Sequence, residues 1–182
     1  MKIVIVGGVA GGATAAARLR RLDEEAEIVL FEKDKYVSYA NCGLPYYIGG
    51  TIEHREELFL QTPEGFNDRF KIDVRVHSEV TTIHPTRKSV TVKDLRTGVA
   101  YEEEYDKLIV STGAAPVMPP IPGINNERIF SLRNVPDTDR IKAAITRKGM
   151  KSALIVGAGF IGLEMAENLK QAGMSVTVVE QA

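Results

Sequence analysis

The sequence predicts an α/β fold in which one strand–helix–strand unit occurs twice, with antiparallel strands between the two copies. Each copy begins with a short apolar segment, passes through a glycine-rich turn into a helical segment, and ends in a second apolar segment followed by a glutamate. Between the copies, short segments rich in β-branched residues are separated by turn residues. The alternation of strand and helix within each copy indicates a parallel sheet.

The first copy lies at the amino terminus. Lys2–Val6 is a short apolar run that ends in glycines, which is typical of a buried parallel strand. Gly12–Leu22 is rich in alanine and predicts a helix, and Glu27–Phe31 predicts a second strand closed by Glu32. A strand, glycine turn, helix and strand in this order form the βαβ half of a Rossmann-like dinucleotide-binding sheet, with a right-handed crossover.

The second copy lies near the carboxyl end. Ala153–Val156 predicts a strand, Leu163–Gln171 a helix, and Ser175–Val179 a strand. Glu180 closes this second strand as Glu32 closes the first. Two copies predict two dinucleotide sites, or a duplicated fold in which one site is vestigial. Because the second copy has no further strands, we expect the sequence to be part of a longer protein.

The segment between the copies predicts an antiparallel meander inserted into the first sheet, followed by one more strand and a linker. The expected meander strands are residues 73–76, 79–83, 89–94 and 100–104, and the strand after them is Leu108–Val110. The segment from Pro116 to Pro122 holds four of the eight prolines and predicts an extended linker. We therefore expect a first domain over 1–115 and, over 116–182, a linker and the first βαβ unit of a truncated second domain.

The composition excludes several classes of protein. The chain has 182 residues, of which 44% are hydrophobic and 26% charged, so it is neither disordered, collagen-like nor disulfide-rich. A net charge of −1 without a basic stripe argues against binding to nucleic acid or to an anionic membrane surface. No apolar run reaches the roughly 18 residues of a membrane span. Glycines break the apolar start and arginines follow it, so we expect a cytoplasmic protein rather than a secreted one.

The second glycine turn has the complete G-x-G-x-x-G pattern, formed by Gly157, Gly159 and Gly162. The first glycine permits the tight turn, the second lets the backbone approach a pyrophosphate, and the third lets helix and strand pack closely. The helix N-terminus adds N–H groups and a partial positive charge for the phosphates. Glu180 stands where a carboxylate accepts both ribose hydroxyls and repels a 2′-phosphate, which favours NADH over NADPH. The alternative is that these glycines serve packing alone.

The first turn, Gly7-Gly8-Val9-Ala10-Gly11-Gly12, is less regular. It keeps the first and third glycines of the pattern but has Val9 at the second. The Val9 side chain is expected to crowd a pyrophosphate unless it points into the core, and the glycines on either side restore room. Glu32 supplies the ribose acceptor of this copy.

Cys42 is the single cysteine and cannot form an intrachain disulfide. It precedes a predicted short helix with Pro45 in its first turn, and the helix dipole there favours a thiolate. Ser38 and Asn41 are polar neighbours, and glycine opens the surface. Two interpretations stay open on the local sequence: a reactive thiol, or a small buried hydrophobic side chain.

Three motifs in combination resemble one enzyme family, the single-cysteine branch of the flavoprotein pyridine nucleotide–disulfide oxidoreductases. Its active-site motif is similar to Ser38-Tyr39-x-x-Cys42, its FAD turn to Gly7–Gly12, and its second flavin contact to Ser111-Thr112-Gly113-x-x-Pro116. The similarity is greatest to coenzyme A disulfide reductases and NADH-dependent persulfide reductases. Tyr47 stands where the glutathione reductase type has a second cysteine, and Ala10 stands where NADH peroxidases and oxidases have a histidine.

The resemblance implies a flavoenzyme that passes electrons from NADH, or NADPH, through FAD to Cys42, which reduces coenzyme A disulfide or a related small disulfide or persulfide. Ser38 and Asn41 then contact substrate beside the sulfur. The residues implied to contact FAD are Gly7, Gly8, Val9, Ala10, Gly11, Gly12, Glu32, Lys33, Val80, Thr112 and Gly113. Those implied to contact the nicotinamide nucleotide are Gly157, Gly159, Ile161, Gly162, Glu164 and Glu180.

Thr14, Arg18 and Arg21 follow each other at spacings of four and three residues, so they share one face of the first helix. In the family this face meets the coenzyme A chain, and arginine suits its phosphates. The alternative is a solvated helix edge. The resemblance also implies that the whole protein is a homodimer. No metal site is expected, because no group of Cys and His residues in the sequence has the spacing of metal ligands.

Two other functions stay open. One is an NADH oxidase or peroxidase in which Cys42 cycles through a sulfenic acid, although Ala10 argues against it. The other is a nucleotide-binding electron-carrier module without thiol chemistry, which predicts a buried and unreactive Cys42.

Overall fold

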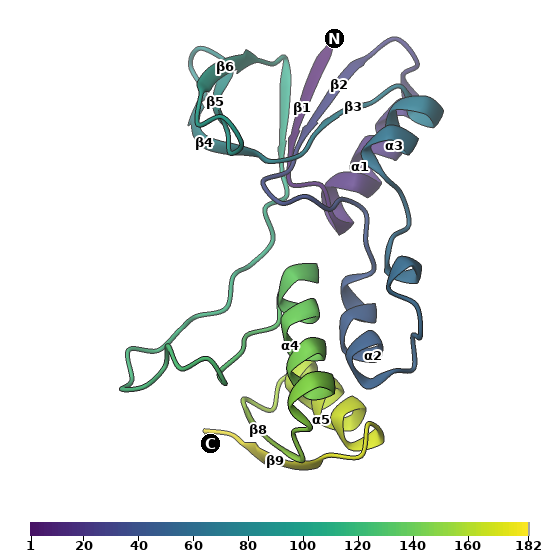
Figure 1. Cartoon of the computed structure of the whole chain (residues 1–182). Helices are drawn as coiled ribbons and strands as arrows, with labels where there is room; N and C mark the ends of the chain where they lie inside the picture. Colours follow the sequence, from purple (N-terminus) through teal and green to yellow (C-terminus); the bar gives the residue numbers. More distant parts are fainter. Residues whose placement is uncertain (182) are drawn as a thin grey trace. The chain divides into compact units, whose positions relative to one another are not determined.

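The computed structural model describes residues 1–181, which form two compact units. Unit 1 consists of Met1–Tyr39 and Phe59–Gly113, and unit 2 of Ala40–Leu58 together with the chain from Ala114 onward. In Figure 1, unit 1 runs from purple to teal and contains the two larger sheets, whereas unit 2 contains the green and yellow elements of the carboxyl end. The predicted α/β fold class is confirmed.

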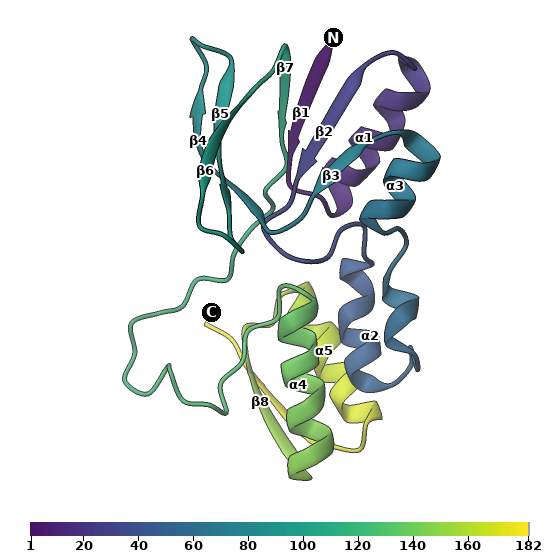
Figure 2. The same cartoon turned by 45° about the horizontal axis from the view of Figure 1, so that its top comes forward.

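Unit 1 is built on a parallel sheet with the strand order β3-β2-β1-β7. Its strands are β1 (Lys2–Val6), β2 (Glu27–Phe31), β3 (Asp73–Arg75) and β7 (Lys107–Val110), and its helices are α1 (Ala10–Leu22) and α3 (Pro63–Phe70). Figure 2 shows both helices on one face of this sheet and the antiparallel strands on the other. Since both faces are covered, β1 and β2 are continuous apolar runs rather than alternating ones.

Alternate side chains of β1 enter two different cores. Ile3 and Ile5 pack with Ala13, Ala16 and other apolar residues on the helix side. Val4 and Val6 pack on the opposite side of the sheet with Val90, Val92 and their neighbours. The period of two residues in a strand therefore gives unit 1 three layers: helices, parallel sheet and meander.

The meander is a separate sheet of three antiparallel strands, β4 (Ser78–His84), β5 (Ser89–Asp94) and β6 (Ala100–Glu104). The prediction that residues 73–76 form its first strand was wrong. This segment forms β3, which pairs in parallel with β2, because Ile72 and Val74 pack into the core on the helix side. As predicted, the meander is inserted in the chain between two strands of the first sheet, β3 and β7, and it packs on one face of that sheet.

A group of charged side chains joins the meander to the parallel sheet. Glu103 of β6 accepts from Lys2 Nζ of β1 at 2.5 Å and from Arg75 Nη1 of β3 at 2.6 Å. Lys2 also pairs with Glu27 at 2.8 Å, and Arg75 with Asp73 at 2.7 Å. Glu103 is buried, so both of its oxygens are satisfied by charged donors rather than by water.

We expect Glu103→Gln to lower the free energy of unfolding by about 2 kcal/mol near pH 7, because it weakens two charge-assisted hydrogen bonds at a buried position. Burial by itself raises the pKa of Glu103, but hydrogen bonds from Lys2 and Arg75 outweigh it and hold the pKa below the usual 4.5. A lowered pKa in the folded state stabilises the protein above the unfolded pKa, and this contribution is lost as the pH falls through the folded value. Urea unfolding of the wild type and of Glu103→Gln from neutral to acidic pH measures this difference in stability.

The control is Glu102→Gln, which removes an exposed ion pair with Arg87. Equal stability of wild type and Glu103→Gln at neutral pH would contradict the prediction.

Unit 2 contains a two-stranded parallel sheet with helices packed on it. The elements are η1 (Asn41–Gly43), α2 (Leu44–Gly49), η2 (Arg55–Leu58), α4 (Val135–Lys148), β8 (Ser152–Val156), α5 (Phe160–Gln171) and β9 (Ser175–Val179). Residues 40–58 precede the 115/116 division expected from the sequence, yet they group with unit 2. The reason is that Ile48 packs in one core with Ile141 of α4 and with Met165 and Leu169 of α5.

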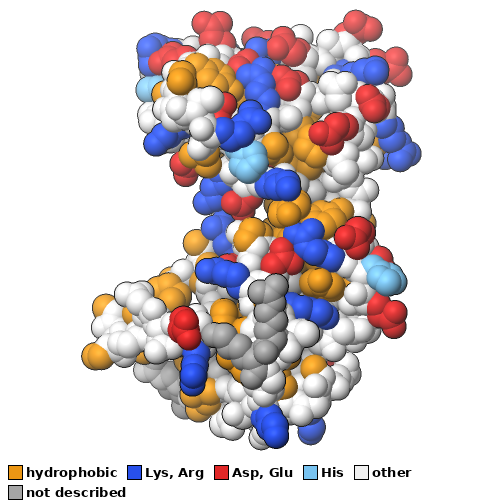
Figure 3. All heavy atoms as spheres, in the orientation of Figure 1, with side chains coloured by type: hydrophobic (Ala, Val, Ile, Leu, Met, Phe, Trp, Pro, Cys, Tyr) orange, Lys and Arg blue, Asp and Glu red, His pale blue; other side chains and the backbone are white. Residues whose placement is uncertain are grey.

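The surface carries both signs of charge. On the face shown in Figure 3, Lys and Arg side chains alternate with Asp and Glu side chains. Among the described residues, no helix is both long enough and apolar enough to cross a membrane.

Candidate functional site

The first glycine turn connects β1 to α1 with very little space. Gly7 has a φ of +100°, and a β-carbon there would lie within 3.0 Å of the Ser111 carbonyl oxygen. A β-carbon on Gly12 would lie within 3.0 Å of the Gly7 carbonyl oxygen. Glycine at the first and third positions of the pattern therefore has the predicted steric cause: a left-handed turn and direct contact between helix and strand.

The start of α1 fits the anionic group expected there. No side chain caps this end of the helix, and its first turn contains no acidic residue. Ala10 and Gly11 are exposed, and Val9, the N-cap residue, is partly exposed. Because the first amide groups of a helix lack partners within it, this exposed and uncharged end can donate to a pyrophosphate such as that of FAD.

The two predicted ribose acceptors also hold their own glycine turns in place. Glu32 is buried, and its carboxylate accepts from Gly8 N at 2.8 Å and from Asp34 N at 2.9 Å. Glu180 repeats this arrangement, because it accepts from Ala158 N, at the equivalent position after the first glycine of its own turn. That each carboxylate also accepts a hydrogen bond from its own glycine turn was not predicted. The similar distance in sequence between each turn and its glutamate is the one signal of this role in the sequence.

The second turn leaves room for a ligand. A β-carbon on Gly162 would lie within 3.0 Å of the Gly157 carbonyl oxygen, as in the first turn. In contrast, a β-carbon on Gly159 would have no neighbouring atom within 4 Å. Ile161 is exposed, and Glu164 is partly exposed on α5. This open side of the turn leaves space for the pyrophosphate of a nicotinamide dinucleotide, and contact between Gly159 and that pyrophosphate stays a prediction.

The remaining predicted FAD contacts lie at several places in unit 1. Thr112 and Gly113 follow β7, where Ser111 N donates to Val6 O at 2.7 Å, so they leave the sheet beside the first glycine turn. Lys33 is exposed after β2. Val80 lies on β4 and packs partly against the meander core. Its predicted contact with a cofactor stays a prediction.

Ser38 adopts an unusual backbone conformation next to the first turn. Its φ is +46°, in the left-handed region that favours glycine. Two hydrogen bonds hold it there: Ser38 N donates to Gly8 O at 2.8 Å, and Leu60 N donates to Ser38 O at 2.9 Å. Lys71, His77 and Lys88 take the same conformation elsewhere, so the contact of Ser38 with substrate stays a prediction.

Cys42 is an exposed free thiol in the η1 turn of unit 2. Asn41 is exposed beside it, whereas Gly43, Leu44 and Pro45 are buried. A β-carbon on Gly43 would lie 3.2 Å from side chains of Ile52 and Leu58, so the chain is held closely just after the sulfur. The alternative in which Cys42 is a small buried side chain is therefore wrong.

The helix face predicted to meet substrate is open. Thr14, Arg18 and Arg21 are all exposed on α1. The neighbouring Arg20 is different, because its guanidinium donates to the carbonyl oxygens of Phe70, Asp23, Glu24, Ala26 and Lys71. Arg20 thus ties α1 to α3 and the β2 loop, while Arg18 and Arg21 stay available to a charged ligand.

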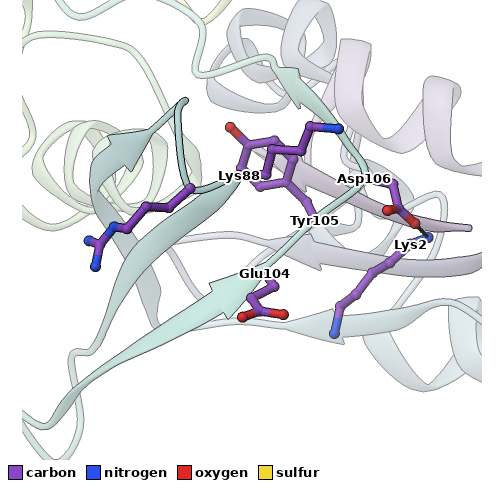
Figure 4. A pocket seen from close by; sticks show the side chains of 6 residues that line it. Lys2, Lys88, Glu104, Tyr105 and Asp106 are labelled. Atoms are coloured by element: carbon purple, nitrogen blue, oxygen red, sulfur yellow. Dashed lines mark hydrogen bonds between the residues drawn. The ribbon is translucent and has the colours of Figure 1, made fainter.

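A separate cavity of about 420 Å³ lies at the amino end of β1, the opposite end from the glycine turn. Figure 4 shows the side chains that line it: Lys2, Arg87, Lys88, Glu104, Tyr105 and Asp106. Asp106 accepts from Lys2 N at 2.7 Å there. None of the predicted site residues lines this cavity, so we assign it no part in the site.

Comparison with known proteins agrees with this geometry. Residues 1–182 match the family model described as pyridine nucleotide-disulphide oxidoreductase. Coenzyme A disulfide reductase of Staphylococcus aureus (strain JH9) is 44% identical over 181 residues, which cover 100% of this chain and 41% of that protein.

Two solved structures are also similar. The crystal structure of reduced Bacillus anthracis CoADR-RHD has 56% identity and a TM-score of 0.95, and the match covers 100% of this chain and 33% of that one. The structure of a NAD-dependent persulfide reductase from A. fulgidus has 41% identity and a TM-score of 0.92, covering 98% of this chain and 33% of that one. The chain thus spans less than half the length of these relatives. It belongs to the pyridine nucleotide-disulphide oxidoreductase family, as the combination of its three motifs predicted.

Proposed function

We propose that the whole protein uses NADH and FAD to reduce a small disulfide or persulfide, of which coenzyme A disulfide is the first candidate, through Cys42. The observation that carries the proposal is an exposed single thiol in a chain with two dinucleotide turns. The similarity to coenzyme A disulfide reductase and to a persulfide reductase supports the choice of acceptor.

Cys42 carries the thiol chemistry of this proposal. Its thiolate attacks one sulfur of the disulfide, the S–S bond breaks, and one coenzyme A thiolate leaves and takes up a proton. A mixed disulfide between Cys42 and the second coenzyme A is left. The turn at the start of α1, fixed by Glu32, would hold FAD, and the bound flavin would supply to this sulfur the two electrons of NADH. The second coenzyme A then leaves with a proton and Cys42 returns to the thiolate, so one NADH and one proton yield two thiols.

The remaining predicted site residues bind coenzyme A and NADH and orient them. Exposed Arg18 and Arg21 can pair with the phosphates of coenzyme A, and Asn41 can donate beside the sulfur. Glu180, fixed on its turn, favours the free ribose hydroxyls of NADH over the 2′-phosphate of NADPH. We expect a cytoplasmic homodimer. These assignments extend the family membership and are part of the proposal.

The test is the electron acceptor used by the full-length protein. We expect NADH oxidation with coenzyme A disulfide or a coenzyme A persulfide to exceed the rates with oxygen, peroxide and glutathione disulfide. The intact mass of the oxidised protein should show a coenzyme A adduct that thiol reductants remove. Faster turnover with oxygen or peroxide, together with a sulfenic acid on Cys42, would instead establish the oxidase or peroxidase alternative.

A further inference from the structure

The segment that carries Cys42 is held by side chains that come much later in the chain. Helix α2 begins at Leu44, directly after the η1 turn that contains Cys42. Its Ile48 is 3% exposed and packs with Ile141 of α4 and Leu169 of α5. The position of the thiol within unit 2 therefore depends on the two long helices of that unit.

At its carboxyl end, α2 lies directly against α5. A β-carbon on Gly49 would stand 2.7 Å from the Asn168 β-carbon and 2.8 Å from the Asn168 carbonyl oxygen. Asn168 is 1% exposed, and its Nδ2 donates to Glu164 O at 2.8 Å. This close contact leaves α2 no freedom to move toward α5.

Lys142 of α4 holds the same end of α2 from another direction. Its Nζ donates to Tyr47 O at 2.5 Å and lies 4.5 Å from the centre of the Tyr47 ring. Tyr47 O also accepts from Gly50 N at 3.3 Å, so the ammonium is a second donor to a carbonyl group at the carboxyl end of α2. Lys142 is partly buried, and this burial lowers the pKa of its ammonium group. A half-buried lysine opposite a carbonyl and an aromatic face is positioned by packing rather than by chance on the surface.

The segment that follows α2 is also held by α4, through an ion pair. Arg55 of η2 makes a bidentate pair with Asp139 of α4, with Nε–Oδ1 and Nη2–Oδ2 distances of 2.8 Å each. Asp139 lies three residues before Lys142, one helical turn away. One stretch of α4 thus fixes the chain on both sides of Gly50, where the backbone takes a left-handed turn.

We propose that Lys142 is a positioning residue for Cys42, which sets the reactivity of the thiol by fixing helix α2 from α4. The catalytic meaning of this inference rests on the proposed function, whereas the effect on the thiol does not. Because Cys42 is already exposed, loosening α2 adds little access for a reagent. It instead frees the η1 turn, in which Gly43 N donates to Ala40 O at 2.9 Å, so the sulfur is held less firmly in one orientation and the thiol reacts more slowly.

The first test follows the alkylation of Cys42 in the full-length protein, with the modified peptide identified by mass spectrometry. We expect Lys142→Met, which keeps the unbranched stem, to slow the alkylation of Cys42 by iodoacetamide at least about threefold. Amide hydrogen exchange over residues 43–50 should rise about tenfold in the same variant. Lys142→Arg should restore both rates to within about twofold, because it still donates to a carbonyl and stacks on an aromatic ring. The control Lys170→Met, at the exposed end of α5, should change neither.

The second test uses turnover of the full-length protein. Lys142→Met should lower kcat with the disulfide about tenfold, whereas the rate at which NADH reduces the flavin stays unchanged. Alkylation at the wild-type rate in Lys142→Met would overturn the inference, as would slowed alkylation in Lys170→Met. If wild type reduces no disulfide, the proposed function fails, but the alkylation and exchange results still decide the role of Lys142.

Discussion

Replacing Cys42 by serine is expected to lower turnover of the full-length protein with coenzyme A disulfide at least about a thousandfold. Losses of this size occur when the nucleophile of a covalent mechanism is removed. The serine hydroxyl is not ionised near neutral pH and forms no disulfide, so neither the attack on substrate nor the mixed disulfide is available. NADH should still reduce bound flavin at the wild-type rate, because acceptance of hydride does not use the sulfur. Stopped-flow measurement of flavin absorbance, beside steady-state NADH oxidation, separates the two steps.

The control for this substitution is Ser38→Ala. Ser38 lies next to the first glycine turn and is expected to contact substrate without forming a bond to it, so its replacement should leave much of the turnover. If Cys42→Ser retains full turnover, the electrons leave the flavin by a route without a thiol. That outcome would reject the disulfide reductase proposal and favour the electron-carrier alternative.

The second large effect is expected at Gly12. Alanine there would place a carbon within 3.0 Å of the Gly7 carbonyl oxygen, and neither atom belongs to a side chain that can rotate away. Helix α1 would have to move off β1, and the buried Ala13 and Ala16 would lose contacts with Ile3 and Ile5. We expect Gly12→Ala to cost about 3 kcal/mol or more of stability and to abolish the retention of FAD by the full-length protein. Because the chain has no Trp, far-UV circular dichroism in urea is the suitable measurement.

Gly159→Ala is the matched control for Gly12→Ala, since both residues belong to a dinucleotide turn. Gly159 has an extended backbone conformation with φ −68° and ψ 176°, and no atom lies within 4 Å of its added carbon. Its alanine variant should change the free energy of unfolding by less than about 0.5 kcal/mol. It should nevertheless weaken NADH binding, because the methyl group occupies the space for the pyrophosphate. Equal destabilisation by the two alanines would show that the steric argument is wrong.

The two βαβ units could be predicted from the sequence, because each glycine turn marks where a strand ends and a helix begins. The limits of β1, β2 and β9 agree with the sequence-based ranges because strand, turn and helix follow one another within each βαβ unit. Helix α4 was missed, although Asn134 as N-cap, Pro136 in the first turn and Gly149 at the end are visible start and stop signals. The parallel pairing of β3 and the grouping of residues 40–58 with unit 2 could not be predicted, since both depend on contacts between distant parts of the chain.

In the candidate site too, features of the local sequence were predictable, whereas contacts between distant residues were not. The local sequence left Cys42 open between a reactive and a buried thiol, and the structure shows it exposed, as are Asn41, Arg18 and Arg21. The contacts of these side chains with substrate stay predictions. Nothing in the sequence separates Arg20, which binds five backbone carbonyls, from its neighbours on the helix. Lys142 was likewise not predicted, because its partner Tyr47 is far away along the chain.

The hydrogen bonds from Gly8 to Glu32 and from Ala158 to Glu180 have a consequence for affinity. Each hydrogen bond restrains its loop before a nucleotide arrives, so less conformational entropy is left to lose on association. Tight retention of a dinucleotide can then come from the order of the empty loop as much as from the contacts made to it.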